Sequence, residues 1–280
     1  MAVRTEAVTI IRPAGSAWSN SAVQLRELAD YGDLLRTLSV HRISVRYRQT
    51  VLGVVWAVLQ PLLMMAIFVG VFSYLARMPS EGSPYALFAY TALLPWTFFS
   101  TAVTNATGSL VSHTQLITKV YFPREILPVT YVIASLFDFM LGLVALIGLM
   151  MWFQVPLTAA TWHLIPVVAL LTAWILGVAL LSSAAQVRWR DIGFAMPLLV
   201  QIVMFASPVI YPLGLVPAAW RPWYLLNPMA GIINSFRDIL LRGVQPEPLP
   251  LLYATIVTAG TLPLAYAIFK RAEATMADVV

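Results

Sequence analysis

Long apolar stretches separated by short polar segments make up most of the chain. Six of them are about as long as a helix that crosses the hydrocarbon core of a bilayer. They cover residues 53–76, 85–107, 126–153, 163–187, 192–211 and 250–269. Because hydrocarbon offers the backbone no hydrogen-bond partners, each stretch is predicted to be a helix. The pattern therefore predicts an all-α membrane protein, with six transmembrane helices in a domain that spans residues 53–270.

A different periodicity precedes the first apolar stretch. On a helix over residues 21–48, one face would carry Leu28, Tyr31, Leu35, Leu38 and Val45, and the opposite face Asp30, Asp33, Thr37, His41, Ser44 and Arg48. Ser21 followed by Gln24 has the spacing of a capping box at its start. We expect an amphipathic helix in the membrane interface. The alternative is a soluble helix packed on another subunit. Residues 1–20 lack a long apolar core and are interpreted as an N-terminal tail, not a signal peptide.

The segment between the second and third apolar stretches predicts a short helix over residues 112–124. Ser112 and Gln115 again have capping-box spacing, and Pro123 is expected to stop the helix after about ten residues. Tyr121 and Phe122 follow, and both are expected to be exposed. Such an aromatic pair suits either docking into the groove of a partner or anchoring at the membrane interface.

The proline-rich segment 212–249 predicts a helix that is too short and polar to span. Asn227 and Pro228 suit its N-cap and first turn, and Gly243 suits a left-handed stop. We expect this helix to return into or onto the outer half of the membrane, as part of a gate. The alternative is a helix that lies on the membrane surface beside an aromatic belt.

Composition narrows the possible classes further. Apolar residues make up 60% of the chain and charged residues only 10%, which argues against a soluble enzyme or a disordered protein. The basic residues lie between apolar stretches, so the net charge of +5 indicates membrane anchoring and not nucleic-acid binding. Counted over alternate segments, Lys and Arg favour the side that holds both termini, which are therefore expected in the cytoplasm. The C-terminal tail would cover residues 271–280.

Several kinds of chemistry are missing. No phosphate-binding loop is present, because neither Lys119 nor Lys270 follows the required glycine pattern. The three histidines are isolated and there is no cysteine, so we expect no metal site and no catalytic residue. Asp138 is the one acidic residue clearly inside an apolar stretch. A lone acid at this depth is a candidate functional residue, or it pairs with a neighbouring polar group.

Several separated motifs resemble one family of transporters. They are Arg46-Tyr-Arg-Gln-Thr-Val-Leu-Gly-Val-Val-Trp56, Gln60-Pro-Leu62, Leu116-Ile-Thr-Lys-Val-Tyr-Phe-Pro-Arg-Glu-Ile-Leu-Pro128, Arg188-Trp-Arg-Asp191, Ser207-Pro-Val-Ile-Tyr211 and Leu226-Asn-Pro228. Together they are similar to the permease subunits of ABC-type exporters of O-antigen, capsule and teichoic acid. The resemblance covers about residues 25–270.

This resemblance implies an assembly and a cargo. Two permease copies would form a channel in the inner membrane, above two separate ATPase subunits that bind ATP and Mg, while this chain holds no cofactor. The cargo would be a glycan linked to polyprenyl diphosphate or to another lipid. Residues 112–124 match the ATPase-coupling helix, with the candidates His113, Gln115, Leu116, Lys119, Tyr121, Phe122, Arg124 and Glu125. Residues 217–242 match the outer gate helices, with the candidates Trp220, Trp223, Tyr224, Asn227 and Phe236.

The residues themselves suggest where such a cargo would bind. Aromatic rings stack on the C–H faces of sugars, and an i+4 stripe on the first span followed by polar and aromatic residues of the second suits a glycan channel. The candidates for its lining are Trp56, Gln60, Phe68, Phe72, Trp96, Phe98, Phe99 and Asn105. Arg46 and Arg48 lie at head-group depth, where guanidinium groups could bind a diphosphate. The alternatives are ordinary packing for the stripe and a positive-inside anchor for the arginines.

The sequence thus predicts the membrane subunit of an exporter of lipid-linked polysaccharide. The first alternative is the same architecture exporting a drug or a small lipid. The second is a membrane-embedded glycan-processing enzyme, which would need convergent carboxylates. A passive channel is third, because the Asn-Pro-Met-Ala run at residues 227–230 occurs once and without an inverted repeat.

Overall fold

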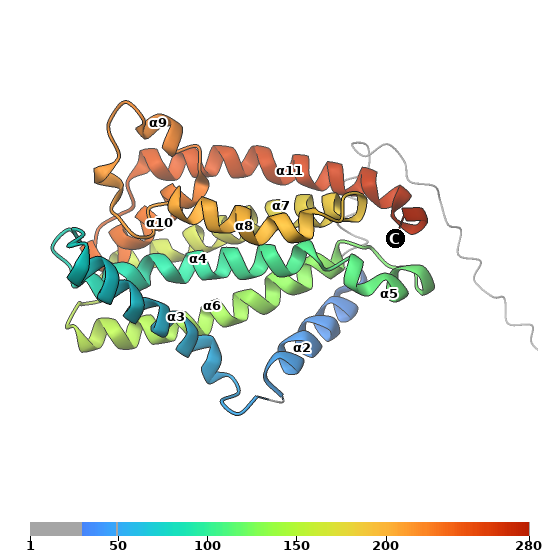
Figure 1. The fold of residues 1–280 in the computed structure, drawn as a ribbon, viewed down its shortest axis with the longest axis horizontal. Coiled ribbons are helices and arrows are strands. Elements are labelled where there is room, and N and C mark those ends of the chain that lie inside the picture. Colours follow the sequence, from blue (N-terminus) through green and yellow to red (C-terminus); the bar gives the residue numbers. More distant parts are fainter. Residues whose placement is uncertain (1–29, 49, 280) are drawn as a thin grey trace, which may run out of the picture.

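The structure is a computed structural model that describes residues 30–48 and 50–279 as an elongated bundle of helices (Figure 1). The helices of its first half are α2 (Gly32–Arg48), α3 (Val55–Phe68), η1 (Val69–Leu75), α4 (Tyr85–Thr107), η2 (Val111–His113), α5 (Thr114–Lys119) and α6 (Ile126–Trp152). Those of its second half are η3 (Ala159–His163), α7 (Leu164–Arg188), α8 (Ile192–Phe205), η4 (Leu213–Leu215), α9 (Arg221–Tyr224), α10 (Pro228–Arg237), η5 (Asp238–Arg242) and α11 (Pro248–Val279). The start of the predicted amphipathic helix, with Ser21, Gln24 and Leu28, lies outside the described residues.

Five helical segments are long and apolar enough to cross a membrane. They are Val55–Leu75, Tyr85–Thr107, Ile126–Trp152, Ala159–Arg188 and Pro248–Glu273. The remaining apolar stretch was expected to be helical from residue 192 to 211, but α8 ends at Phe205 after 14 residues. At 1.5 Å per residue it spans about 21 Å, which is less than the hydrocarbon thickness. Pro208 explains the early end, since it disfavours a helical conformation at the residue before it.

Helix α4 lies at the centre of the bundle, where α3, α6, α7, α8 and α10 pack around it (Figure 1). In its most apolar part 78% of the residues are buried, compared with 11% in the segment Val55–Leu75. Its mean hydropathy of 1.4 is also the lowest of the five. A helix that is surrounded by protein has no need of a lipid-facing surface, so α4 can carry polar side chains that the outer helices cannot.

The short helix α10 is enclosed at one end of the bundle. All ten of its residues are buried, so the alternative of a helix lying on the surface is wrong. The start of α10 follows the sequence prediction, because the side chain of Asn227 accepts a hydrogen bond from the backbone of Met229. The predicted stop at Gly243, with a left-handed φ of 66°, ends the π-helix η5 that continues α10. Polar backbone at membrane depth is tolerated only where protein or water covers it, and here protein covers it.

The predicted helix 112–124 is shorter than expected and starts differently. Its regular part is α5, which begins at Thr114 and ends at Lys119, four residues before Pro123. The predicted capping box is wrong. Ser112 lies in the 3₁₀ turn η2, and its hydroxyl donates to the carbonyl of Gly108 at 2.8 Å and not forward into α5. Because the backbone already turns before α5, no side chain is needed to start that helix.

Helix α2 packs along α6. The polar stripe from Asp30 to Arg48 is exposed, as the periodicity predicts. On the other face, Tyr31, Leu35 and Leu38 pack against a cluster that includes Phe122. Val45 departs from this pattern, because its side chain is 60% exposed; Val40, about one and a half turns earlier, is 55% exposed. The apolar face of α2 is therefore largely covered by the chain's own bundle.

Candidate functional site

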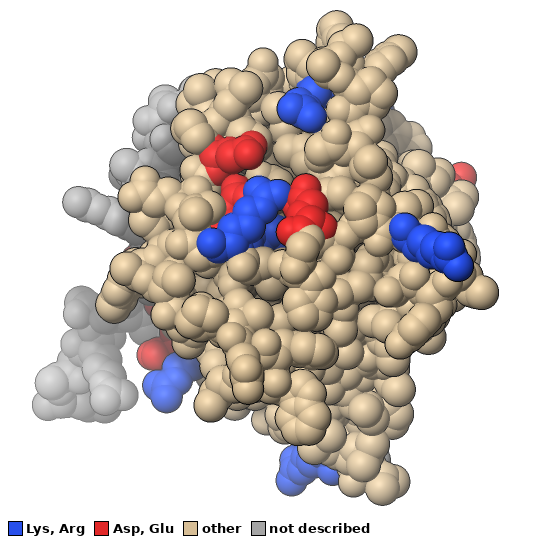
Figure 2. Space-filling view, turned by 90° about the vertical axis from the view of Figure 1, so that its left-hand side faces the viewer, with Lys and Arg blue, Asp and Glu red and all other residues tan. Residues whose placement is uncertain are grey.

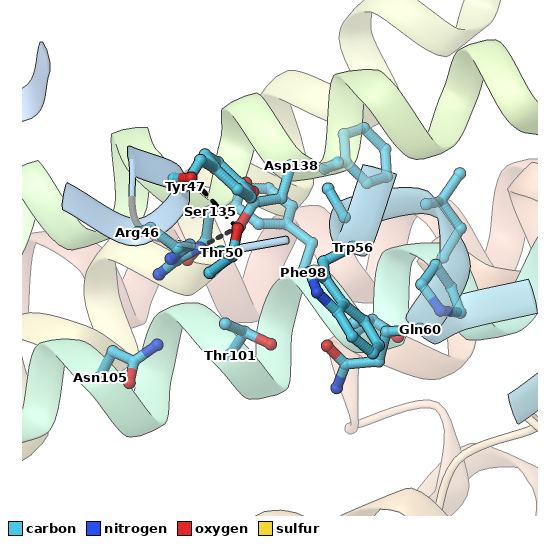
Figure 3. A pocket seen from close by; sticks show the side chains of 15 residues that line it. Arg46, Tyr47, Thr50, Trp56, Gln60, Phe98, Thr101, Asn105, Ser135 and Asp138 are labelled. Atoms are coloured by element: carbon cyan, nitrogen blue, oxygen red, sulfur yellow. Dashed lines mark hydrogen bonds and ion pairs between the residues drawn. The ribbon is translucent and has the colours of Figure 1, made fainter. Parts of the chain in front are cut away.

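A pocket of about 410 Å³ opens between α2, α3, α4 and α6 (Figure 3). The end of α2 and the turn after it contribute Arg46, Tyr47 and Thr50, and α3 contributes Trp56 and Gln60. The central helix α4 and its neighbour α6 supply Thr97, Phe98, Thr101, Asn105, Ser135 and Asp138. Polar side chains from four helices thus meet in a bundle whose other surfaces are mostly apolar.

Asp138 lies at the centre of the polar contacts in this pocket. Its carboxylate forms an ion pair with Arg46 and accepts a hydrogen bond from the Tyr47 hydroxyl, as the dashed lines in Figure 3 show. The Arg46 and Asp138 side chains are 28% and 21% exposed. Burial and the hydrogen bond to Asp138 raise the pKa of Tyr47 well above its ordinary value, so this hydroxyl stays protonated and donates. The alternative that the sequence left open, that Asp138 pairs with a neighbouring polar group, is therefore what the structure shows.

The two arginines predicted to act together do not converge. Arg48 is exposed and does not line the pocket. Instead, Tyr47, which lies between them in the sequence, contacts the same carboxylate as Arg46. Adjacent residues of a helix are about 100° apart, and two long side chains can still reach one group on α6. The side chains of residues two positions apart point about 200° apart around the helix axis, so Arg48 points away from the pocket.

One turn earlier, α2 makes a second polar contact with α6. The guanidinium of Arg42 lies over the ring of Tyr131, 3.2 Å from its centroid. Burial lowers the pKa of Arg42 from its ordinary value. The same tyrosine ring meets the edge of His113, with centroids 6.3 Å apart. Tyr131 therefore lies between α2 and the segment that was predicted to couple to the ATPase.

Several polar side chains that line the pocket have no hydrogen-bond partner among the described residues. Within the part of the chain that the structure describes, the side chains of Gln60, Thr97, Thr101 and Asn105 make no hydrogen bonds. The three from α4 are spaced four residues apart, so they share one face of that helix, and Figure 3 shows two of them, Thr101 and Asn105. Trp56 is 44% exposed beside them. Together they form a surface of amides, hydroxyls and one indole that is free to bind another molecule.

Only half of the predicted glycan-channel residues line this pocket. Trp56, Gln60, Phe98 and Asn105 do. Phe68, Trp96 and Phe99 are buried in the main core, with Phe72 packed against it. A step of four residues turns a helix by 400°, so an i+4 stripe drifts about 40° per step and leaves the face on which it began. The π-helix η1, from Val69 onward, changes the register again.

Several pocket residues were absent from the sequence-based candidates. They are Tyr47, Thr50, Thr97, Thr101 and Ser135, together with Asp138, which was noted but not placed in a site. Thr97 and Thr101 could have been found from the sequence, because they continue the i+4 series that contains Asn105. Tyr47 and Ser135 carry no such pattern, and only the contact between α2 and α6 reveals them.

The predicted coupling residues divide into exposed and buried groups. Tyr121 is 76% exposed, but Phe122 is only 4% exposed, so the expectation that both aromatic rings are available is wrong for Phe122. Gln115 and Lys119 are exposed, Leu116 is half-buried, and Glu125 is buried. Phe122 is needed to fill the cluster beneath α5, where it packs with Ile117 and Phe269.

A buried ion cluster ties this segment to the end of α11. Lys270 donates to the Glu125 carboxylate and to Glu273, both at 2.8 Å. Arg124 donates to the backbone carbonyl of Glu273 at 2.6 Å. Burial and the neighbouring Glu273 raise the pKa of Glu125, while Lys270 opposes that shift. Arg124 and Glu125 therefore hold two helices together, which leaves little of them for a partner.

The candidate outer-gate residues are similarly divided. Trp220 and Trp223 are 67% and 71% exposed, which suits an aromatic belt. Tyr224 is half-buried and bonds the Tyr211 hydroxyl at 3.2 Å. Asn227 caps α10 and also donates to the Ser207 hydroxyl at 2.8 Å. Phe236 is fully buried against Phe139, so it belongs to the core and not to an exposed gate.

Few charges reach the surface at this end of the molecule. In Figure 2 a basic side chain lies between acidic ones on a largely uncharged face. Arg242 at the end of η5 makes ion pairs with Glu81 and Asp238. Among the described residues no three His, Asp or Glu side chains are grouped so that they could hold a metal ion.

A helical bundle with several candidate membrane-spanning segments and a polar pocket between α2, α3, α4 and α6 defines a multi-pass membrane protein. The comparison with known families specifies it further, since the model of the ABC-2 type transporter family matches residues 33–241. The chain belongs to this family. A relative from Myxococcus xanthus, the O-antigen export system permease protein RfbA, is 32% identical over 91% of this chain and 98% of its own.

Two further relatives are more distant but cover similar lengths. The O-antigen export system permease protein RfbA of Klebsiella pneumoniae is 27% identical, over 89% of this chain and 95% of its own. The polysialic acid transport protein KpsM of Escherichia coli is 23% identical, over 86% and 94%. The similarity therefore extends over nearly the whole transmembrane bundle.

Proposed function

We propose that this chain is the transmembrane permease subunit of an ATP-driven exporter. It would move a lipid-linked polysaccharide from the cytoplasmic to the outer side of the inner membrane. The relatives support this proposal, because three proteins named for O-antigen export or polysialic acid transport align with 86–91% of the chain. The missing phosphate-binding loop is consistent with a separate ATPase subunit that holds ATP and Mg.

The observation that carries the proposal is the free polar surface of the pocket. Amides and hydroxyls that face hydrocarbon without partners are costly, so a spanning bundle keeps them only where water or cargo reaches them. Gln60, Thr101 and Asn105 offer donors and acceptors for sugar hydroxyls, and Trp56 offers a ring for the C–H face of a sugar. These are the groups that a glycan requires, and a purely apolar cargo would not use them.

The charged end of the pocket suits the lipid-linked end of the same cargo. A guanidinium binds phosphate oxygens with two hydrogen bonds at once, so Arg46 is suited to the diphosphate of a polyprenyl carrier. Arg48, exposed at the same end of α2, is assigned to lipid head groups nearby. Arg46 would thus anchor the cargo while the chain of sugars lies along the polar face of α4.

The assembly that we propose contains two copies of this chain and two ATPase subunits. Val55–Leu75 packs little against its own bundle, and a second copy would cover it beside the pocket. Tyr121 and Lys119, exposed after and within α5, would dock into the ATPase. Helix α8, with the segment up to Tyr211, would complete a sixth crossing and leave both termini in the cytoplasm.

Export by purified components tests this function. The chain and its partner ATPase would be reconstituted into liposomes that contain the lipid-linked glycan, and ATP-dependent appearance of glycan on the opposite side would be measured. We expect transport with the wild-type chain and at least a tenfold loss in the double variant Gln60→Ala/Asn105→Ala. Gln201→Ala, which changes an exposed amide of α8 outside the pocket, is the matched control. Transport of drugs or small lipids at equal rates in place of glycan would contradict the proposal.

A further inference from the structure

Arg46, the cation assigned to the cargo, already has an anion bound to it. Asp138 forms an ion pair with this guanidinium, so the pocket as it stands offers no free positive charge to a phosphate. The two residues lie 92 positions apart, on α2 and α6. No local pattern accounts for their pairing, and each would be costly to bury alone.

The second contact of Asp138 makes this arrangement reversible. One carboxylate oxygen accepts from Arg46 and the other from the Tyr47 hydroxyl. If Arg46 turned to another anion, Asp138 would still be held by Tyr47. Ser135 lies one turn earlier on the same helix and lines the same pocket. Its buried hydroxyl has no partner among the described residues, so it can take the place of the departed guanidinium.

We propose that Asp138 competes with the cargo for Arg46 and so sets how strongly an anion must bind to be held in this pocket. It is a resident anion that a ligand must displace before binding. One carboxylate carries a single negative charge, so a diphosphate displaces it more readily than a monophosphate does, and an uncharged lipid cannot displace it. This inference rests on the proposed function, since it refines how the same pocket selects the charged end of its cargo.

Binding of defined probes to the full chain, purified in detergent, tests the competition. Farnesyl diphosphate supplies a lipid-linked diphosphate, farnesyl monophosphate a single phosphate, farnesol no charge and inorganic pyrophosphate no lipid. The variant Asp138→Asn removes the competing charge and keeps the shape and the hydrogen bond from Tyr47. Asp33→Asn makes the same change in charge on the exposed stripe of α2 and serves as the matched control.

We expect Asp138→Asn to bind farnesyl diphosphate roughly tenfold more tightly than wild type, which is the effect of one charge-assisted contact. Its affinity for farnesyl monophosphate should rise by a similar factor, because both ligands must break the same ion pair before they bind Arg46. Farnesol binding should not change. Asp33→Asn should match wild type throughout. Pyrophosphate binding as tight as that of farnesyl diphosphate would identify a site for the free anion and overturn the lipid-linked assignment.

The variant Arg46→Gln separates this inference from the proposed function. If it abolishes diphosphate binding while Asp138→Asn binds as wild type does, the competition is wrong and the head-group site stands. If Arg46→Gln binds diphosphate normally, the head-group site itself is wrong. Should Asp138→Asn fail to give a monodisperse peak in size exclusion, Tyr47→Phe weakens the hold on Asp138 without changing charge. The competition then predicts weaker binding of farnesyl diphosphate by Tyr47→Phe, because Asp138 loses the hydroxyl that would hold it once Arg46 turns away, and unchanged binding would overturn it.

Discussion

At the scale of single residues, the most unusual feature is the buried Arg237. Its guanidinium lies over the Phe88 ring, 3.5 Å from the centroid. It donates to the backbone carbonyls of Pro208 at 2.7 Å, Val209 at 3.0 Å and Tyr211 at 3.2 Å. Burial lowers the pKa of Arg237 to about 9, so the side chain is still protonated at neutral pH. One cation thus fixes the irregular segment that follows α8.

Removing this side chain should destabilise the protein strongly. Arg237→Ala would leave the carbonyls of Pro208 and Val209 buried without donors, and we expect a loss of about 3 kcal/mol or more in the free energy of unfolding. Denaturant unfolding in mixed micelles would measure it. Arg221→Ala, at an exposed arginine of the neighbouring α9, should change stability by less than about 0.5 kcal/mol. Equal stabilities of the two variants would show that the buried contacts contribute little.

Two glycines should respond in opposite ways to one added methyl group. A Cβ at Gly231 would lie 2.2 Å from the carbonyl oxygen of Pro250, which is backbone and cannot move aside easily. A Cβ at Gly148, within α6, would meet nothing within 4 Å.

Gly231→Ala should therefore push α10 from α11 and lower the melting temperature by several degrees. Gly148→Ala should raise the stability by up to about 1 kcal/mol, because alanine favours the helix more than glycine does. Thermal unfolding of both purified variants is the measurement. A melting temperature of Gly231→Ala at or above that of wild type would contradict the close contact between α10 and α11.

At the scale of elements, two adjacent residues after α5 are expected to have different roles. Tyr121 is exposed and would dock into the ATPase, whereas Phe122 is buried and packs in the core. Tyr121→Ala removes an exposed ring, so we expect weaker copurification with the ATPase and an unchanged melting temperature. Loss of a central aromatic anchor typically costs ~2 kcal/mol of binding. Phe122→Ala instead empties a buried site and should cost about 3–5 kcal/mol of stability. If Tyr121→Ala keeps full ATPase association, this ring is a membrane anchor and not a docking residue.

Helix positions could largely be predicted from the sequence, because hydrophobic length and periodicity act locally. Such local patterns account for the five long spans, the exposed stripe of α2, the start of α10 and the stop at Gly243. The early end of α8 at Phe205 could not be predicted from the apolar composition of the stretch, because composition alone does not show that Pro208 stops the helix. The burial of α10 also could not be predicted, because its period-3.6 pattern suits a membrane surface as well as a protein interior.

The candidate site was harder to predict because it depends on contacts between distant elements. Arg46 and Asp138 were each noted in the sequence, but nothing in their spacing shows that α2 lies along α6. The exposure of Tyr121 and the burial of Phe122 depend likewise on how α11 packs below α5. Sequence patterns therefore supplied the right kinds of residues, and the fold decided which of them share a pocket.

At the scale of the whole molecule, the two ends of the bundle differ in their charges. One end holds Arg124 and Lys270 close to Glu125 and Glu273, with the exposed α5 beside them. The other end holds Trp220 and Trp223 with Arg242 between two acids. Because Lys and Arg facing the cytoplasm set the orientation of most membrane proteins, we propose that the end that carries α5 faces the cytoplasm.

Because the chain contains no cysteine, this orientation can be tested with single introduced thiols. Gln245→Cys lies in the exposed segment before α11, and Arg188→Cys lies at the exposed end of α7. In intact cells a membrane-impermeant maleimide should label position 245 fully and position 188 only after the membrane is permeabilised. An odd number of crossings between the two positions requires that α8 and the residues up to Tyr211 pass through the bilayer. Labelling of both positions in intact cells would place them on one side, and α8 would then be a re-entrant helix in a five-span protein.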